Sequence, residues 1–273
     1  MRGVFTLLMC ATVAPLASTA QAPRPSDRLP LFGYEQTIQF PSDSNYSVER
    51  ITPAEHDFYS KLIYFEGIPI KAHESVENRA LYVAHEKLSK LFGGFGAYRS
   101  AILANLLRHR VELHVIGRLQ NMTDLPENRA RKKGGRFEEF GGLTLDERSR
   151  GGGGRLVSCG EENLLALPAD RYAGNDICIH EFAHAIRTFG LPESLRRQFD
   201  QQFENSVAKK LWAGDYAATN PDEFFAELTR RYFGKGLNDF LSYDPESFAL
   251  FSRFYGGSFP LEDFLPVSGL HGK

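Results

Sequence analysis

The chain has no marked excess of charge of either sign. Its 273 residues include 32 lysines and arginines and 34 aspartates and glutamates, so the formal net charge is −2 at pH 7. Proteins that bind nucleic acid or anionic membranes through electrostatics usually carry a clear basic excess. With 42% hydrophobic and 24% charged residues, the composition is that of a globular protein with a sizeable core. We therefore expect neither nucleic acid nor an anionic membrane as a partner.

Long hydrophobic runs are also scarce. One run, VFTLLMCATVAPLA from Val4 to Ala17, follows the positively charged Arg2 and precedes the small residues Ser18–Ala20. It is shorter than the roughly 20 apolar residues that a membrane-spanning helix needs. The pattern is typical of a secretory signal peptide, which we assign to residues 1–20. No second run is long enough to span a bilayer, so we expect a secreted protein without a membrane anchor after the signal is removed.

The remaining sequence predicts one domain preceded by a short leader. Residues 21–50 are rich in proline, serine and aspartate, which predicts an extended N-terminal segment, and the domain is expected over residues 51–273. Within it, residues 121–154 are charged and glycine-rich, which predicts a surface excursion rather than a domain boundary. Apolar patterning predicts helices over 52–65, 78–92 and 97–109, and strands over 111–117 and 155–167.

Cysteine is rare, with three in the chain. Cys10 belongs to the predicted signal peptide and leaves with it. Cys159 and Cys178 remain, and an even number of cysteines in an oxidising compartment favours a disulfide. This bridge would close a loop that ends two residues before His180. The alternative is a pair of free buried thiols.

The stretch ICIHEFAHAIRTFG, from Ile177 to Gly190, places three ionisable residues in an otherwise apolar run. On a helix, His180 and His184 lie on the same face, and Glu181 is offset by about 100°. Two such imidazoles can bind one zinc ion, and the neighbouring carboxylate can accept a proton from water. Burying these groups without a metal would be costly. We therefore predict one catalytic Zn²⁺ bound by His180 and His184, with Glu181 as the general base.

Two other His-Glu pairs act as internal controls. His73-Glu74 and His85-Glu86 lack the second histidine, because Glu77 and Ser89 occupy the corresponding positions. They are interpreted as exposed polar residues of helices.

The third zinc ligand is expected downstream. The extended pattern HExxHxxGxxH fails, because Arg187 and Gly190 replace its glycine and its last histidine. Further on, Asn220 can cap a helix that has proline at its first position, and Glu223 then follows three residues after the cap. Glu223 is either the third ligand or a capping-box glutamate. Glu227, one turn later, could accept a hydrogen bond from a ligand histidine.

HEFAH, a downstream tyrosine and the segment EFFAE (residues 223–227) together resemble the gluzincin metallopeptidases, and most closely the family of the anthrax lethal factor catalytic domain. The resemblance covers residues 175–233. It implies His180, His184 and Glu223 as zinc ligands, Glu181 as general base, and Tyr216 as a helper that stabilises the reaction oxyanion. A rival resemblance, to the deuterolysin-like group, rests on GDYA and would make Asp215 the third ligand.

These observations predict an α+β, zincin-like fold. We expect a twisted sheet with a backing helix, the HEFAH helix on its face, and a helical lower half that carries Glu223. An edge strand around Leu156–Leu165 is expected to receive an extended peptide by strand addition. The predicted function is that of a secreted zinc metallopeptidase acting on peptides or proteins. The alternative is a secreted zinc-binding protein with a structural or inactive site.

Overall fold

The computed structural model describes residues 47–131, 134–138 and 141–259. The chain divides into two units, residues 1–33 and 34–273, and all described residues belong to the second. The predicted signal peptide (1–20) and the extended segment (21–50) up to residue 46 lie outside the described residues. Within the described part, no helix has the length and apolar character needed to cross a membrane.

The central element is a mixed six-stranded sheet with the order β1-β2-β3-β4-β8-β7. The first three strands pair antiparallel, β3, β4 and β8 are parallel, and β7 returns antiparallel to β8. This sheet and the helices that pack on it make the fold α+β, as predicted. The strands are β1 (Glu49–Glu55), β2 (Tyr59–Phe65), β3 (Ile68–His73), β4 (Glu112–Ile116), β7 (Gly151–Gly152) and β8 (Leu156–Gly160). A separate two-stranded sheet joins β5 (Arg136–Phe137) to β6 (Leu143–Thr144).

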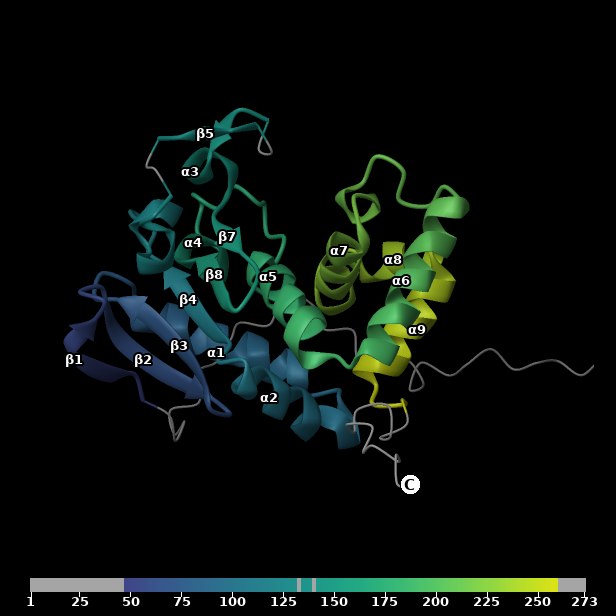
Figure 1. Ribbon diagram of the computed structural model, residues 1–273, viewed down its shortest axis with the longest axis horizontal. Helices are drawn as coiled ribbons and strands as arrows, with labels where there is room; N and C mark the ends of the chain where they lie inside the picture. Colours follow the sequence, from purple (N-terminus) through teal and green to yellow (C-terminus); the bar gives the residue numbers. More distant parts are fainter. Residues whose placement is uncertain (1–46, 132–133, 139–140, 260–273) are drawn as a thin grey trace, which may run out of the picture. The chain divides into compact units, whose positions relative to one another are not determined.

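Helices flank this sheet and form the C-terminal half. In Figure 1, α5 lies between the sheet on one side and α6, α7, α8 and α9 on the other. The predicted helices at 78–92 and 97–109 are found as α1 and α2. The α-helices are α1 (Asn78–Phe92), α2 (Arg99–Arg108), α3 (Leu145–Arg148), α4 (Glu161–Leu164), α5 (Ile177–Ala185), α6 (Glu193–Ala208), α7 (Pro221–Phe233), α8 (Leu237–Tyr243) and α9 (Pro245–Tyr255). Shorter turns are the 3₁₀ segments η2 (Gly96–Tyr98), η3 (Met122–Asp124), η4 (Pro126–Asn128) and η7 (Tyr216–Ala218), and the π-helical turn η6 (Ile186–Gly190).

The prediction of a helix over residues 52–65 was wrong, because this stretch forms the β1–β2 hairpin. His56 and Asp57 both adopt positive φ, 54°, and turn the chain between the strands. In β2, Ile63 and Phe65 are buried while Tyr64 between them is 48% exposed. This alternation, together with the preference of isoleucine and aromatic residues for strands, outweighs the helical spacing.

The predicted edge strand around Leu156–Leu165 also needs correction. β8 ends at Gly160 and lies inside the sheet between β4 and β7, and the next four residues form α4. The edge is β7, where Gly151 pairs with Cys159 and Gly152 with Ser158. Two glycines carry no hydrophobic alternation, so this strand left no recognisable signal in the sequence.

The buried core joins the sheet to the helices. α1 packs against β2, β3 and α5, while α5 also packs against β8 and α7. Phe225 of α7 forms an aromatic cluster with Phe199 of α6 and Phe251 of α9, with ring centroids 4.8–5.5 Å apart. The position of α7 relative to the sheet is thus set by continuous apolar packing.

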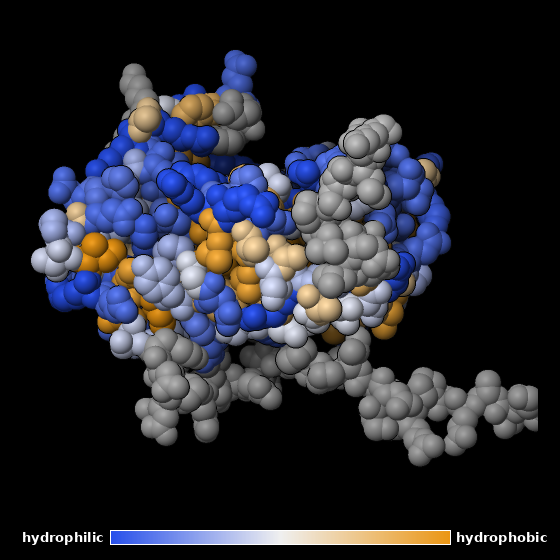
Figure 2. All heavy atoms as spheres, turned by 60° about the horizontal axis from the view of Figure 1, so that its bottom comes forward, coloured by the Kyte–Doolittle hydropathy of each residue, from blue (hydrophilic) through white to orange (hydrophobic). Residues whose placement is uncertain are grey.

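The face in Figure 2 is largely hydrophilic, with apolar side chains exposed among the polar ones.

In its described residues, the predicted excursion over 121–154 contains only short elements. Met122, Leu125 and Leu145 attach it to the main domain by packing with Phe58 and Ile116 in a second, smaller cluster. This excursion is therefore part of the same domain, and its last residues include β7, the edge strand beside β8.

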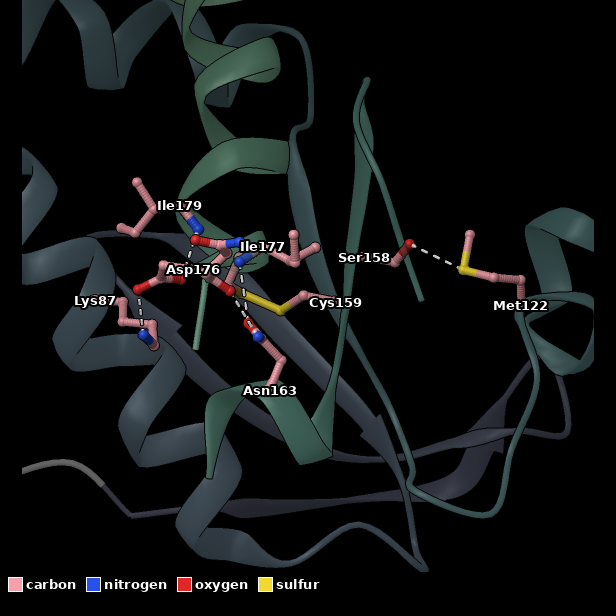
Figure 3. Close-up of a disulfide and its surroundings, with 10 residues drawn as sticks. Lys87, Met122, Ser158, Cys159, Asn163, Asp176, Ile177 and Ile179 are labelled. Carbon is pink, nitrogen blue, oxygen red and sulfur yellow. Dashed lines mark hydrogen bonds and ion pairs between the residues drawn. A yellow bond between two sulfur atoms is a disulfide. The ribbon is translucent and has the colours of Figure 1, made fainter. Parts of the chain in front are cut away.

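The predicted disulfide between Cys159 and Cys178 is present and joins β8 to the first turn of α5, with 5.1 Å between the Cα atoms. Figure 3 shows further anchors around this bridge: Asp176 caps α5 by accepting from the Ile179 N–H, and its other oxygen pairs with Lys87 of α1. Asn163 accepts a hydrogen bond from the Ile177 N–H. The start of α5 is thereby attached to the sheet, to α1 and to α4.

Replacing both cysteines with alanine should lower the free energy of unfolding. The bridge spans 19 residues. In the loop-closure model a bridge of this size stabilises by roughly 3 kcal/mol. Urea unfolding of metal-free wild type and of the Cys159→Ala/Cys178→Ala variant would measure the difference. A difference near zero, or two titratable thiols in the native wild type, would contradict the bridge.

Candidate metal centre

The candidate centre begins on α5, which carries His180, Glu181 and His184. One helical turn separates the two histidines, and their Nε2 atoms lie 3.2 Å apart. His180 is buried, with 6% exposure, and His184 is half-buried. Donor atoms of these three residues lie within 4.8 Å of one another.

A second helix completes the cluster. α7 begins after Asn220, whose side chain accepts a hydrogen bond from the Glu223 N–H, with Pro221 in the first turn. Glu223 Oε2 lies 3.2 Å from His180 Nε2 and 3.3 Å from His184 Nε2. The carboxylate therefore points towards the histidines of α5 rather than back to the cap, as a capping-box glutamate would.

The geometry of these three atoms fits a zinc ion. Glu223 Oε2 is buried and accepts no hydrogen bond from any described residue. Ligands about 2.0–2.1 Å from a tetrahedral ion lie about 3.3–3.4 Å from one another. The observed separations of 3.2–3.3 Å match that spacing. Two imidazoles and one carboxylate are also a donor set that zinc prefers and that leaves a coordination position open.

Glu227, one turn along α7, lies behind His180. Its Oε1 is 3.2 Å from His180 Nδ1, an ion-pair distance, although the angle is not that of a hydrogen bond. Its Oε2 accepts hydrogen bonds from Arg230 at 2.6 and 3.1 Å, and Arg230 also donates to Asn175. Sequence reasoning missed Arg230, and the only available signal was its spacing of three residues from Glu227 on a helix.

The charges in this cluster stabilise one another in the metal-free protein. Burial lowers the pKa of His180, but the carboxylates of Glu223 and Glu227 outweigh it and raise that pKa to about 9. Burial raises the pKa of Glu223, but the two histidines outweigh it and hold that pKa well below its usual range. The pKa of Glu227 falls to about 2, because His180 and Arg230 outweigh burial. The site thus favours an ionised Glu223.

Glu181 differs from the other carboxylates. Burial raises its pKa, and the nearby positive charges of His180 and His184 oppose that effect without reversing it. A half-buried carboxyl with a raised pKa, close to a metal site, has the properties of a proton acceptor that can later release its proton.

Tyr216 of η7 stands at the mouth of the centre. Its hydroxyl donates to Glu223 Oε1 at 3.2 Å and accepts from Arg148 Nη2 at 3.3 Å. The ring is 45% exposed. Tyr216 and the three candidate ligands line a cleft of about 540 Å³, so the centre opens to solvent and to a ligand.

Asp215, the rival third ligand, is used elsewhere. One of its oxygens accepts from the Ala217 N–H at 3.0 Å and the other from Arg231 at 2.5 Å. It caps η7 and pairs with Arg231.

The chain matches no protein-family model and no curated protein sequence. It is similar to a solved structure. This is the Pro-Pro endopeptidase PPEP-2 from Paenibacillus alvei, with 22% sequence identity and a TM-score of 0.49, over 67% of this chain and 92% of that one.

Strand β7 and the glycines after it cross directly over α5. A Cβ atom on Gly153 would lie 2.7 Å from His184 Cβ, and one on Gly151 would lie 2.7 Å from Ile177 Cγ2. Such distances are shorter than real contacts between these atoms. Glycine is therefore required where the edge of the sheet passes over the histidine helix.

Gly153→Ala should weaken zinc binding, because the new methyl group must displace His184 or the strand. We expect a loss of about 10–100-fold, the range seen when the support of a metal ligand is disturbed. Competition with a chromophoric chelator would measure it. Gly152→Ala is the matched control, because its nearest atoms would be 3.4 Å away. Equal affinity in the two variants would contradict the close approach.

Proposed function

We propose that this protein is a zinc-dependent metallopeptidase of the gluzincin type. The observation that carries the proposal is the meeting of His180 Nε2, His184 Nε2 and Glu223 Oε2 at mutual distances of 3.2–3.3 Å, with no hydrogen-bond donor to the buried oxygen among the described residues. These three side chains are the proposed ligands of one catalytic zinc ion. The open cleft beside them supports an enzymatic rather than a purely structural site.

Glu181 is the proposed general base. When bound, zinc supplies Lewis acidity, which lowers the pKa of water and polarises a carbonyl group. Glu181 would accept a proton from the attacking water and later deliver it to the leaving amine. Its raised pKa favours the uptake of the proton.

Glu227 and Arg230 are proposed to orient His180. The carboxylate of Glu227 faces Nδ1, which favours the tautomer with its proton on that atom and leaves Nε2 as the ligand. Arg230 holds the carboxylate in place from the other side.

Tyr216 is proposed to donate a hydrogen bond to the oxyanion that develops during hydrolysis. Its hydroxyl already lies 3.2 Å from Glu223 Oε1, next to the proposed ligand. Because the ring is only half-buried, the phenol has room to turn from Glu223 towards a substrate.

The proposed substrate is a peptide or protein in an extended conformation. β7 is the last strand in its sheet, and it crosses α5 at the histidines. A peptide strand that added to this edge would have its backbone bonded beside the centre. The disulfide is consistent with the proposed secretion of the protein.

A structural zinc site is the alternative from another class of function. Such a site needs a fourth protein ligand, and Glu181 is the carboxylate placed to serve, since it lies in the same 4.8 Å cluster as the histidines. The two hypotheses therefore differ in the role of Glu181, which is the general base in a catalytic site and the fourth ligand in a structural site.

Glu181→Gln should keep zinc and lose peptide cleavage, because glutamine cannot accept the proton. We expect kcat/KM to fall by about 10²–10⁴-fold, the range for removal of a general base. Cleavage of an unbiased peptide mixture, followed by mass spectrometry, and zinc content would be measured together. Loss of zinc from this variant would favour the structural site, and normal turnover would exclude the proposed base.

Glu223→Ala should release zinc, because it removes one of three ligands. The loss should exceed the roughly 10–100-fold effect of disturbing an outer-shell partner. Asp215→Ala serves as the matched control and should retain zinc, since Asp215 is paired with Arg231. Equilibrium dialysis against buffered zinc would compare the two variants. The opposite ranking of the two variants would make Asp215 the ligand.

A further inference from the structure

The charged groups that line the cleft are not all balanced by the protein. Of its carboxylates, Glu127 pairs with His114 at 2.6 Å and Glu227 pairs with Arg230 at 2.6 Å. Glu181 and Glu223 belong to the metal centre. Two cations remain in the cleft wall, Arg131 and Arg148, and neither has an ion-pair partner among residues 47–131, 134–138 and 141–259. These two arginines place two positive charges in the cleft wall that pair with no described carboxylate, although the chain as a whole carries −2.

The backbone that carries Arg148 is held firmly. Thr144 and Glu147 form a capping box at the start of α3. The Asp146 carboxylate accepts from the N–H and the hydroxyl of Thr123 at 2.9 and 2.8 Å. Arg171 donates to the carbonyl oxygens of Asp146 and Glu147. An exposed side chain with no ion-pair partner is therefore presented from a fixed support.

Arg148 extends from this support towards the catalytic centre. Its Nη2 donates to Tyr216 OH at 3.3 Å, and its guanidinium carbon lies 6.0 Å from the centre of the Tyr216 ring. Tyr216 in turn bonds Glu223, so one side chain separates Arg148 from the proposed ligand. In Figure 1, α3 and α7 stand on opposite sides of α5, and the Arg148–Tyr216 contact links those two sides.

The rest of the guanidinium is available for a ligand. Arg148 has five N–H donors, and within the described part of the chain it makes one hydrogen bond, to Tyr216. A planar guanidinium with adjacent free donors binds a carboxylate through two parallel hydrogen bonds. Met122 and Leu145 line the same cleft and add apolar surface beside such a pair.

We infer that the cleft recognises an acidic side chain of its peptide substrate, an aspartate or glutamate close to the scissile bond, through Arg148, with Arg131 adding to the positive field. This inference rests on the proposed peptidase function. It assigns Arg148 to substrate recognition, and it identifies the preferred substrates as acidic peptides.

A synthetic peptide library in which matched members differ only by Glu, Gln or Lys at one position would test the inference. Wild-type zinc-loaded protein should cleave the Glu members about 10-fold or more faster in kcat/KM than the Gln members at one position near the cleaved bond, as a charge-assisted hydrogen bond allows. Arg148→Gln should abolish that preference, and Arg148→Glu should reverse it in favour of Lys. Arg155→Gln is the matched control, because Arg155 is exposed in the bend just before β8 and does not line the cleft.

Two results would overturn the inference. One is equal cleavage of Glu and Gln members by wild type at every position. The other is a uniform fall in kcat for all members in Arg148→Gln with the Glu preference retained, which would make Arg148 a positioning residue for Tyr216 instead. Failure of the peptidase proposal would look different, since no member would be cleaved at all. In that event, retention of the same library on immobilised zinc-loaded Glu181→Gln protein decides the matter: enrichment of acidic members supports the recognition, and uniform retention overturns it.

Discussion

The packing of α5 against α7 is the constraint on which the rest of this site depends. It buries two imidazoles and a carboxylate against one another, an arrangement that is costly unless the charges are paired or bound to a metal. In the metal-free protein the pairing is electrostatic, with the pKa of His180 raised and that of Glu223 depressed. A metal ion would occupy the point where the same lone pairs meet. The aromatic cluster of Phe199, Phe225 and Phe251 fixes α7 against α6 and α9.

The position of α5 is set from its other end. The disulfide, the Asp176 cap with its Lys87 partner, and Asn163 tie the first turn to three separate elements. Above the helix, β7 approaches so closely that side chains are excluded at Gly151 and Gly153. The histidines are therefore held between a covalent anchor, a glycine edge and the packed helix α7. This preorganisation is what a site needs if its ligands are to keep their geometry when an ion or substrate arrives.

The electrostatics of the cleft differ from those of the whole chain. A net charge of −2 gives no hint of a cationic wall, because charges elsewhere cancel it. What matters locally is which groups already have partners. Glu127 and Glu227 are satisfied by His114 and Arg230, whereas Arg148 faces the centre from a support held by several hydrogen bonds. The excursion of residues 121–154 thus forms one wall of the cleft as well as part of the surface.

Local sequence was enough to determine several features of this protein. The spacing of His180 and His184 places them on one helical face, Asn220 and Pro221 start the helix that carries Glu223, and the two cysteines of the domain pair with each other. Each feature depends on residues that are close together in the sequence or, for the disulfide, on the domain having two cysteines. Local sequence did not predict three other features: the β1–β2 hairpin, the identity of the edge strand and the position of Arg148. Those features depend on which surfaces meet: β7 pairs only because β8 lies beside it, and Arg148 gains its role only because the fold brings its guanidinium within hydrogen-bond reach of Tyr216. Distances between segments far apart in sequence are set by packing, and that packing exists only in the folded chain.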